Sequence, residues 1–262
     1  MSLLINRLHF GYMFFYYSFT FAPLIILVIF SFNDSVRVGL PFKAFSLKWY
    51  AEVLSDPTIL SAIANSLLVG AIVTLLATSG GTAAAFVLVR HPSFLGRKAF
   101  NTLVLIPIVI PPVVLGVSLL IFFHAIGLEL SLVTVILAHT LITLPFSLLV
   151  MVARLIGFDR SLEEAAMDLG ADEFRTFLKV TLPLIFPGVL AAAILAFTIS
   201  FGEVAVAFFT IGYQPTLPVY IFGEVRLPTR LPVLTAVSAL TLSFSAGLVV
   251  ASEITRRVGE KR

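Results

Sequence analysis

Cysteine is absent from this sequence, and charged residues are scarce. Without cysteine the chain forms no disulfide and no thiolate metal site, and its redox compartment stays undetermined. Only 12% of the 262 residues are charged, about half the share of a soluble domain. In contrast, 59% are hydrophobic and the mean hydropathy is +1.08. This composition indicates a membrane protein.

Three kinds of chemical site also lack support in the sequence. The four histidines share no metal-ligand spacing, so no metal site is expected. No G-x-x-x-x-G-K-[ST] motif occurs, so the chain itself is not expected to bind ATP. No arrangement of a nucleophile and a base stands out. We therefore expect no cofactor in this chain.

Six apolar runs are each long enough to cross a membrane, which takes about 20 residues. The runs cover residues 11–32, 59–89, 99–123, 130–153, 184–211 and 231–252. They should be helices, because lipid offers the backbone no partners and the alternating pattern of a barrel is absent. The first run is too long for a signal peptide and is interpreted as an uncleaved span. The sequence thus predicts an all-α membrane protein with six transmembrane helices.

Two of these runs have further features. Gly and Ala are dense between residues 70 and 85, which favours close helix packing. Pro107, Pro111 and Pro112 predict a bend or break in the third run. A break at membrane depth persists where it faces protein or a cavity, so it either lines a pathway or is a structural kink.

Basic residues are distributed unevenly between the connections. Twelve of the 17 lie on one side of the spans: Arg7, Arg90, Arg97, Lys98, Arg154, Arg160, Arg175, Lys179, Arg256, Arg257, Lys261 and Arg262. By the positive-inside rule, both termini and residues 161–183 face the cytosol. The net charge of +3 therefore reflects membrane topology and does not indicate a nucleic-acid partner.

Residues 161–183, SLEEAAMDLGADEFRTFLKVTLP, form a charged segment between the fourth and fifth runs. Ser161 and Glu164 have the spacing of a capping box. An apolar stripe follows at helical spacing, made of Leu162, Ala165, Ala166 and Leu169. The stripe is either a docking surface or a helix face that lies on the membrane or on the protein's own bundle.

A second short helix is predicted after the first. Gly170 supplies a stop for the first helix, and Asp172 can cap the next one. Phe174 and Phe177 would be its apolar anchors, and Pro183 would end the segment ahead of the fifth span. The sequence predicts two short helices that meet at a glycine elbow.

This segment resembles the EAA loop of ATP-binding-cassette importer permeases. Residues 164–166 are EAA, Gly170 follows after three residues, and VTLP at 180–183 follows after nine more. Val180 stands where the family has isoleucine. Weaker support comes from residues 65–67, 107–112 and 200–203. The resemblance covers nearly the whole chain and is particularly to the second-permease subunit of spermidine/putrescine-type importers.

The resemblance implies a type I ABC importer permease fold in a bacterial inner membrane. It implies one permease domain over residues 1–262, with a core at about 59–254 and a coupling loop at 159–183. ATPase subunits, which bind ATP and Mg²⁺, would be partners, together with a homologous second permease and a soluble solute-binding protein. The coupling contact would use Glu164, Ala165, Ala166, Leu169, Gly170 and Phe174.

Three polar residues inside the spans are candidates for a substrate pathway. Glu203 is costly in lipid and is either a cation-attracting site or a group bonded to a neighbouring helix. His139 and Asn65 serve as hydrogen-bonding links between helices or as pathway residues. Related polyamine permeases often carry two adjacent acids here, whereas Gly202 precedes Glu203.

Two other functions and several substrates stay open. A stand-alone secondary transporter would need coupling-ion sites, for which Glu203 alone is thin support. An intramembrane enzyme would need a catalytic constellation, and none is visible. Polyamines, opines, aminophosphonates and other small polar solutes are all compatible with the importer resemblance.

Overall fold

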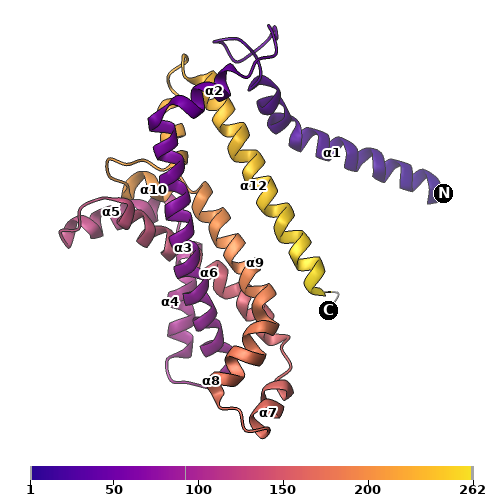
Figure 1. Ribbon diagram of the computed structural model, residues 1–262, viewed down its shortest axis with the longest axis vertical. Coiled ribbons are helices and arrows are strands. Elements are labelled where there is room, and N and C mark those ends of the chain that lie inside the picture. Colours follow the sequence, from indigo (N-terminus) through magenta and orange to yellow (C-terminus); the bar gives the residue numbers. More distant parts are fainter. Residues whose placement is uncertain (1, 92, 261–262) are drawn as a thin grey trace. The chain divides into compact units, whose positions relative to one another are not determined.

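The computed structural model describes residues 2–91 and 93–260 and is built from helices (Figure 1). Its elements are α1 (Ser2–Phe30), α2 (Lys48–Ser55), α3 (Pro57–Arg90), α4 (Arg97–Val109), α5 (Pro112–Ala125), α6 (Leu132–Ile156), α7 (Ser161–Asp168), α8 (Glu173–Thr176), the π-helix η1 (Phe177–Thr181), α9 (Leu182–Gly202), α10 (Ala205–Thr210), α11 (Leu217–Glu224) and α12 (Leu231–Glu260). Among these residues the sole β-type pairing is an isolated bridge between Asn33 and Phe45. The predicted all-α class is confirmed.

The predicted spans correspond to five long helices and one bent pair. The long helices cover His9–Phe30, Pro57–Arg90, Leu132–Ile156, Glu173–Gly202 and Leu231–Val250. The third predicted run forms α4 and α5, which meet at an angle of 111°. The backbone is extended at Ile110 and Pro111, between the two helices. The proline cluster therefore breaks this span, as the sequence predicts.

The chain divides into two compact units, the first made of Met1–Leu60 and Ile221–Phe244. In this unit Arg230 joins the end of α2 to the residues before α12. Its Nη2 lies 2.9 Å from Asp56 Oδ2, and its Nε lies 3.1 Å from Glu224 Oε2. Burial raises the pKa of Asp56, but hydrogen bonds from Arg230 and from the Thr58 and Ile59 amides outweigh burial. The Asp56 pKa therefore lies below its usual value.

The second unit consists of Ser61–Tyr220 and Ser245–Arg262, and its core forms where α3, α6 and α9 pack. The buried residues are Ala84, Ala85 and Leu88 of α3, Leu148, Met151 and Leu155 of α6, and Ile185 and Ala192 of α9. Spacings of three, four and seven residues place these side chains on one face of each helix. Since lipid is as apolar as this core, close packing holds the helices together rather than exclusion of water.

Glycines allow the helices of the second unit to approach closely. A Cβ atom at Gly81 of α3 would lie 2.7 Å from Ser147 Cβ and 2.8 Å from the backbone nitrogen of Leu148, both in α6. A Cβ at Gly116 of α5 would lie 2.8 Å from a ring carbon of Phe209 in α10. These distances are shorter than van der Waals contact. The predicted role of small residues in the 59–89 run is confirmed at Gly81.

Replacing Gly81 with alanine should destabilise the protein, because the added methyl group meets the α6 backbone, which cannot rotate away. Overpacking of this kind costs about 1–3 kcal/mol. Thermal unfolding in detergent should show a lower Tm. Gly80→Ala is the matched control, since its methyl group would meet only the flexible end of Leu144, at 3.1 Å. Equal Tm values for the two variants would contradict this account of the α3–α6 contact.

Candidate coupling loop and intramembrane polar site

The coupling segment (residues 161–183) begins with an aspartate cap. Asp159 Oδ1 accepts a hydrogen bond from the Ser161 amide at 3.0 Å, and the Arg160 carbonyl accepts those of Glu163 and Glu164. Ser161 therefore lies inside the first turn, and the predicted capping box is wrong. The Glu164 amide, which Ser161 would cap, bonds to the Arg160 carbonyl, and the Ser161 amide, which the Glu164 side chain would bind, bonds to Asp159. The same hydrogen bond holds the pKa of Asp159 below its usual value.

A left-handed glycine ends α7, as predicted. Gly170 has a φ of +89°, a conformation that residues with a Cβ atom rarely adopt. The amide of Ala171 bonds to the carbonyl of Ala166, five residues back, at 3.1 Å. Asp172 then caps α8, since its Oδ1 accepts the Arg175 amide at 2.7 Å. The glycine elbow and the second cap are both confirmed.

The helix after the elbow continues through Pro183, contrary to prediction. Residues Glu173–Gly202 form one continuous helix that contains α8, η1 and α9. At η1 the Leu182 amide bonds to the Phe177 carbonyl, five residues back. This wider turn relieves the clash that a proline ring makes with the carbonyl four residues earlier. The coupling segment is therefore built directly onto the fifth span.

The apolar stripe of α7 points away from the rest of the second unit. No residue of α7 is buried. Leu162, Glu164, Ala165, Leu169 and Gly170 are exposed, and Ala166 is half-buried. Leu169 is 90% exposed. In Figure 1, α7 and α8 lie at the end of this unit away from α5 and α10. The interpretation of the stripe as a face resting on the protein's own bundle is therefore wrong.

Phe174 and Phe177 have different surroundings. The Phe177 ring packs edge-on against Phe86 of α3, with centroids 5.5 Å apart. Phe174, one turn farther from the bundle, is 71% exposed. Phe174 is therefore not an internal anchor, and that prediction is wrong. Its ring instead extends the exposed apolar surface of α7.

One side chain of α7 points inward and binds two other elements. Glu163 Oε1 lies 2.7 Å from Arg90 Nη2 and accepts a hydrogen bond from Thr181 Oγ1 at 2.6 Å. Arg90 is the last residue of α3, and Thr181 is the last residue of η1. These residues could not be grouped from the sequence, because Arg90 is 73 positions from Glu163. Glu163 also lies off the apolar stripe, where charged side chains usually face solvent.

The fifth predicted run is not a continuous helix, because it breaks at Glu203. α9 ends at Gly202, and α10 begins at Ala205. The Glu203 carboxylate accepts hydrogen bonds from the amides of Ala205, Val206 and Ala207 at 2.9–3.1 Å. Amides in the first turn of a helix have no partner within that helix. The acid supplies the missing acceptors and thereby permits the break.

His139 of α6 lies beside Glu203. Its Nδ1 is 3.0 Å from Ser200 Oγ, and its Nε2 is 3.6 Å from Glu203 Oε2. The side chain is 1% exposed, and Nε2 has no hydrogen-bond partner among the described residues. The structure thus gathers His139, Ser200 and Glu203 into one polar cluster inside an apolar unit.

Asn65 makes its hydrogen bond elsewhere in the second unit. Its Nδ2 donates to the Pro215 carbonyl at 3.0 Å, and the neighbouring Ser66 Oγ accepts from the Leu217 amide at 2.7 Å. Both bonds tie α3 to the chain around the start of α11. Asn65 therefore has the contact expected of a link between elements.

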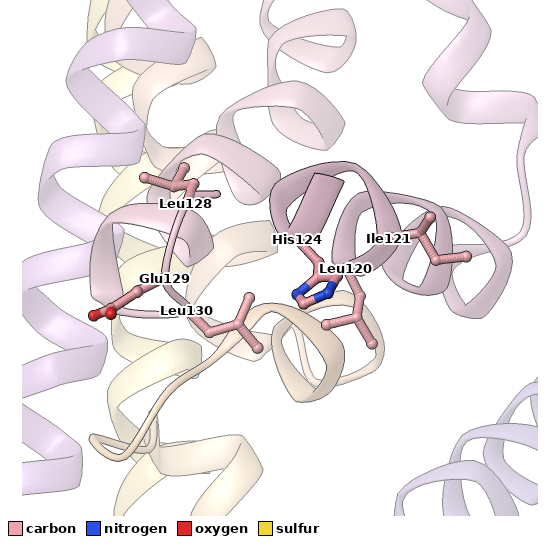
Figure 2. Close-up of a pocket in the computed structure, with 6 residues that line it drawn as sticks. All are labelled: Leu120, Ile121, His124, Leu128, Glu129 and Leu130. Atoms are coloured by element: carbon pink, nitrogen blue, oxygen red, sulfur yellow. The ribbon is translucent and has the colours of Figure 1, made fainter. Parts of the chain in front are cut away.

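Two cavities of the second unit lie outside these contacts. One of about 610 Å³ runs along α3, η1 and α9, and the buried Thr78 hydroxyl that borders it has no hydrogen-bond partner in the part of the chain that the structure describes. Another, of about 310 Å³, lies at the end of α5, where the His124 ring turns toward Leu120 and Leu130 while Glu129 points away (Figure 2). Within residues 2–91 and 93–260, no three His, Asp or Glu side chains gather as a metal site requires.

Sequence comparison places the chain among membrane transport components. Residues 77–258 match the family described as binding-protein-dependent transport system inner membrane component. The putrescine transport system permease protein PotI of Escherichia coli K12 is 38% identical over 240 residues, which cover 89% of this chain and 84% of PotI. The spermidine/putrescine transport system permease protein PotC of Haemophilus influenzae is 36% identical over 248 residues, which cover 94% of this chain and 95% of PotC.

Solved structures show the same fold at low identity. A chain of a bacterial ABC transporter involved in the import of the acidic polysaccharide alginate gives a TM-score of 0.70 at 16% identity, covering 99% of this chain and 96% of that one. A chain of the MetNI methionine ABC transporter, in inward-facing conformations, gives a TM-score of 0.61 at 19% identity. The match covers 80% of this chain and 97% of the MetNI chain. The importer permease fold implied by the EAA loop is confirmed. This chain belongs to the family of binding-protein-dependent transport system inner membrane components.

Proposed function

We propose that this chain is the transmembrane permease subunit of an ATP-driven importer and forms half of the pathway for a small polar solute. The main support is the apolar face of α7, which no described part of the chain covers although both ends of the helix are capped. Large exposed apolar patches mark contacts with partners. Residues 1–262 would form one permease domain, with a core at about 59–254 and a coupling loop at 159–183.

The partner that we propose for this face is an ATPase subunit. The contact would be made by Glu164, Ala165, Ala166, Leu169, Gly170 and Phe174. The alanines allow a close approach, while Leu169 and Phe174 offer apolar area that is largely free. The ATPase subunits would bind ATP and Mg²⁺, since this sequence contains no phosphate-binding loop motif.

The proposed membrane orientation places both termini and the coupling segment in the cytosol of the bacterial cell. Arg154, Arg175 and Lys179 lie around this segment, and the outer connections hold only five of the 17 basic residues. This asymmetry favours a cytosolic coupling face. An ATPase on that side of the inner membrane has access to cellular ATP.

A polyamine-like cation is the substrate that we propose. The relatives PotI and PotC are named for putrescine and spermidine transport. Glu203 offers a carboxylate inside the spans, and its side chain keeps 11% of its surface exposed. We assign Glu203, His139 and Asn65 to the pathway. A homologous second permease would complete that pathway, and a soluble solute-binding protein would deliver the cation.

Reconstitution with and without the ATPase subunits tests the mode of transport. The complex in proteoliposomes, with its binding protein outside, should take up radiolabelled putrescine only when ATP is enclosed and the ATPase is present. Without either component, uptake should fall to the level of empty liposomes. Uptake driven by an ion gradient in the absence of the ATPase would reject this proposal in favour of a secondary transporter.

Gly170→Asp should leave membrane insertion intact and abolish ATPase assembly or transport. The variant places a charge in the proposed contact on a residue with left-handed φ, although a Cβ there meets no atom within 4 Å. Co-purification of the ATPase and ATP-driven uptake measure the effect. Gly127→Asp is the matched control, with a φ of +71° and equally open space on an outer connection. Full assembly with normal transport by the Gly170 variant would count decisively against the coupling role.

Glu203→Gln should lower putrescine uptake about tenfold, which corresponds to about 1.4 kcal/mol of lost interaction with the cation. The glutamine keeps one oxygen as an acceptor for the α10 amides, so the complex should still assemble. Uptake and assembly are measured on the same preparation. Glu129→Gln, which neutralises an exposed acid on an outer connection, should transport normally. Unchanged uptake by the Glu203 variant would remove Glu203 from the pathway.

A further inference from the structure

We propose that Glu163 is a positioning residue through which movement of α7 is transmitted to α3 and α9. Its Oε1 atom binds both Arg90, at the end of α3, and Thr181, at the end of η1. This inference rests on the proposed coupling to an ATPase. It assigns a mechanical role to three residues outside the exposed contact face of α7.

Few contacts determine where α7 lies. None of its residues is buried, and its apolar stripe points away from the unit. Glu163 is the residue of α7 that reaches into the helices, where its side chain is 15% exposed and that of Arg90 is 9% exposed. A displacement of α7 must therefore pull on Arg90 and Thr181 or break their bonds to Glu163.

Arg90 is held so that it cannot follow Glu163 freely. Its guanidinium lies 5.6 Å from the ring centre of Phe86 in α3 and 5.3 Å from that of Phe158, in the connection before α7. Such contacts attract the cation to the ring faces. Phe86 also packs against Phe177 of η1. The Arg90 side chain is therefore held against α3 and the connection before α7, and Phe86 in turn contacts η1.

The bond to Thr181 extends the link to the fifth span. Thr181 lies at the junction of η1 and α9, and its side chain is buried. Short π-helical turns within longer helices are often found at functional sites. Because α8, η1 and α9 form one continuous helix, a pull on Thr181 acts on the cytosolic end of that helix. One carboxylate oxygen of Glu163 is thus bonded to both α3 and the helix of the fifth span.

Neutral side chains of similar length can replace both residues, so that no unpaired charge remains in the protein. Removing one partner of a mostly buried ion pair is strongly destabilising, whereas replacing both is often tolerated. The double variant Arg90→Met/Glu163→Gln should therefore fold and assemble. In proteoliposomes of the complete complex, we expect the double variant to hydrolyse ATP. Its putrescine uptake per ATP hydrolysed should be at least about fivefold lower than that of the unaltered complex.

The matched control is an ion pair in the other unit. Arg230→Met/Asp56→Asn removes a pair 2.9 Å apart with a carboxylate 16% exposed, against 2.7 Å and 15% for Arg90 and Glu163. It also removes the contact between Arg230 and Glu224, so it disturbs its own unit at least as much as the test variant does. The control should change stability but leave the ratio of uptake to ATP hydrolysis unaltered. A normal ratio in Arg90→Met/Glu163→Gln, or an equal loss in both double variants, would overturn the proposed link.

Spin-label distances give a readout that does not depend on the cargo. The chain has no cysteine, so Asp168→Cys and Val87→Cys place single labels on exposed positions of α7 and α3. When the link is intact, the distribution of distances between the two labels should stay narrow after ATP is added to the assembled complex. In Arg90→Met/Glu163→Gln the same distribution should shift or broaden. An unchanged distance in that variant would also overturn the link.

Thr181→Val decides the question if the double variant does not assemble. Valine has nearly the same shape as threonine and removes only the hydrogen bond to Glu163, so the ion pair remains. We expect a smaller loss of uptake per ATP, and a normal ratio would reject the link to α9. Failure of the unaltered complex to bind ATPase subunits would instead reject the proposed function itself.

Discussion

Backbone amides and carbonyls inside a membrane can bond only to protein, and this constraint shapes both broken spans of the chain. At the first break, α5 begins with Pro112 after Pro111, and proline has no amide hydrogen to satisfy. At the second break, the Glu203 carboxylate accepts the first amides of α10. At the other end of α10, the Thr134 hydroxyl donates to the Thr210 carbonyl at 2.6 Å. At the first break two prolines remove amide hydrogens, and at the second Glu203 accepts three of them.

The two breaks also depend on each other. The helices that follow them, α5 and α10, pack together where Gly116 lies against Phe209 and Val206, and Val206 shares a buried cluster with Ala138 of α6. Because both spans are broken, the two short helices can pack against each other. The second break also leaves non-helical backbone next to Glu203 inside the bundle. Such backbone persists only beside protein or a cavity, which is the setting that a solute pathway requires.

Features that depend on local chemistry could be predicted from the sequence. The apolar runs, the proline break, the left-handed Gly170 and the Asp172 cap follow from composition or from the preferences of single residues. The errors concern choices between competing partners. Asp159 accepts the Ser161 amide that the Glu164 side chain was expected to bind, and a π-helical turn accommodates Pro183. The Glu163 bonds to Arg90 and Thr181 depend on how α7, α3 and η1 meet, and no spacing in the sequence encodes that meeting.

The two faces of α7 separate two tasks. A helix of eight residues is not stable by itself, so α7 depends on Asp159 at its start, Gly170 at its end and Glu163 on its inner face. With these contacts in place, the outer face can remain exposed and still be ordered, which lowers the entropy lost when a partner binds. A partner can therefore bind the outer face of α7 while the bonds of the inner face stay in place. Those inner bonds then carry any displacement of α7 into the spans.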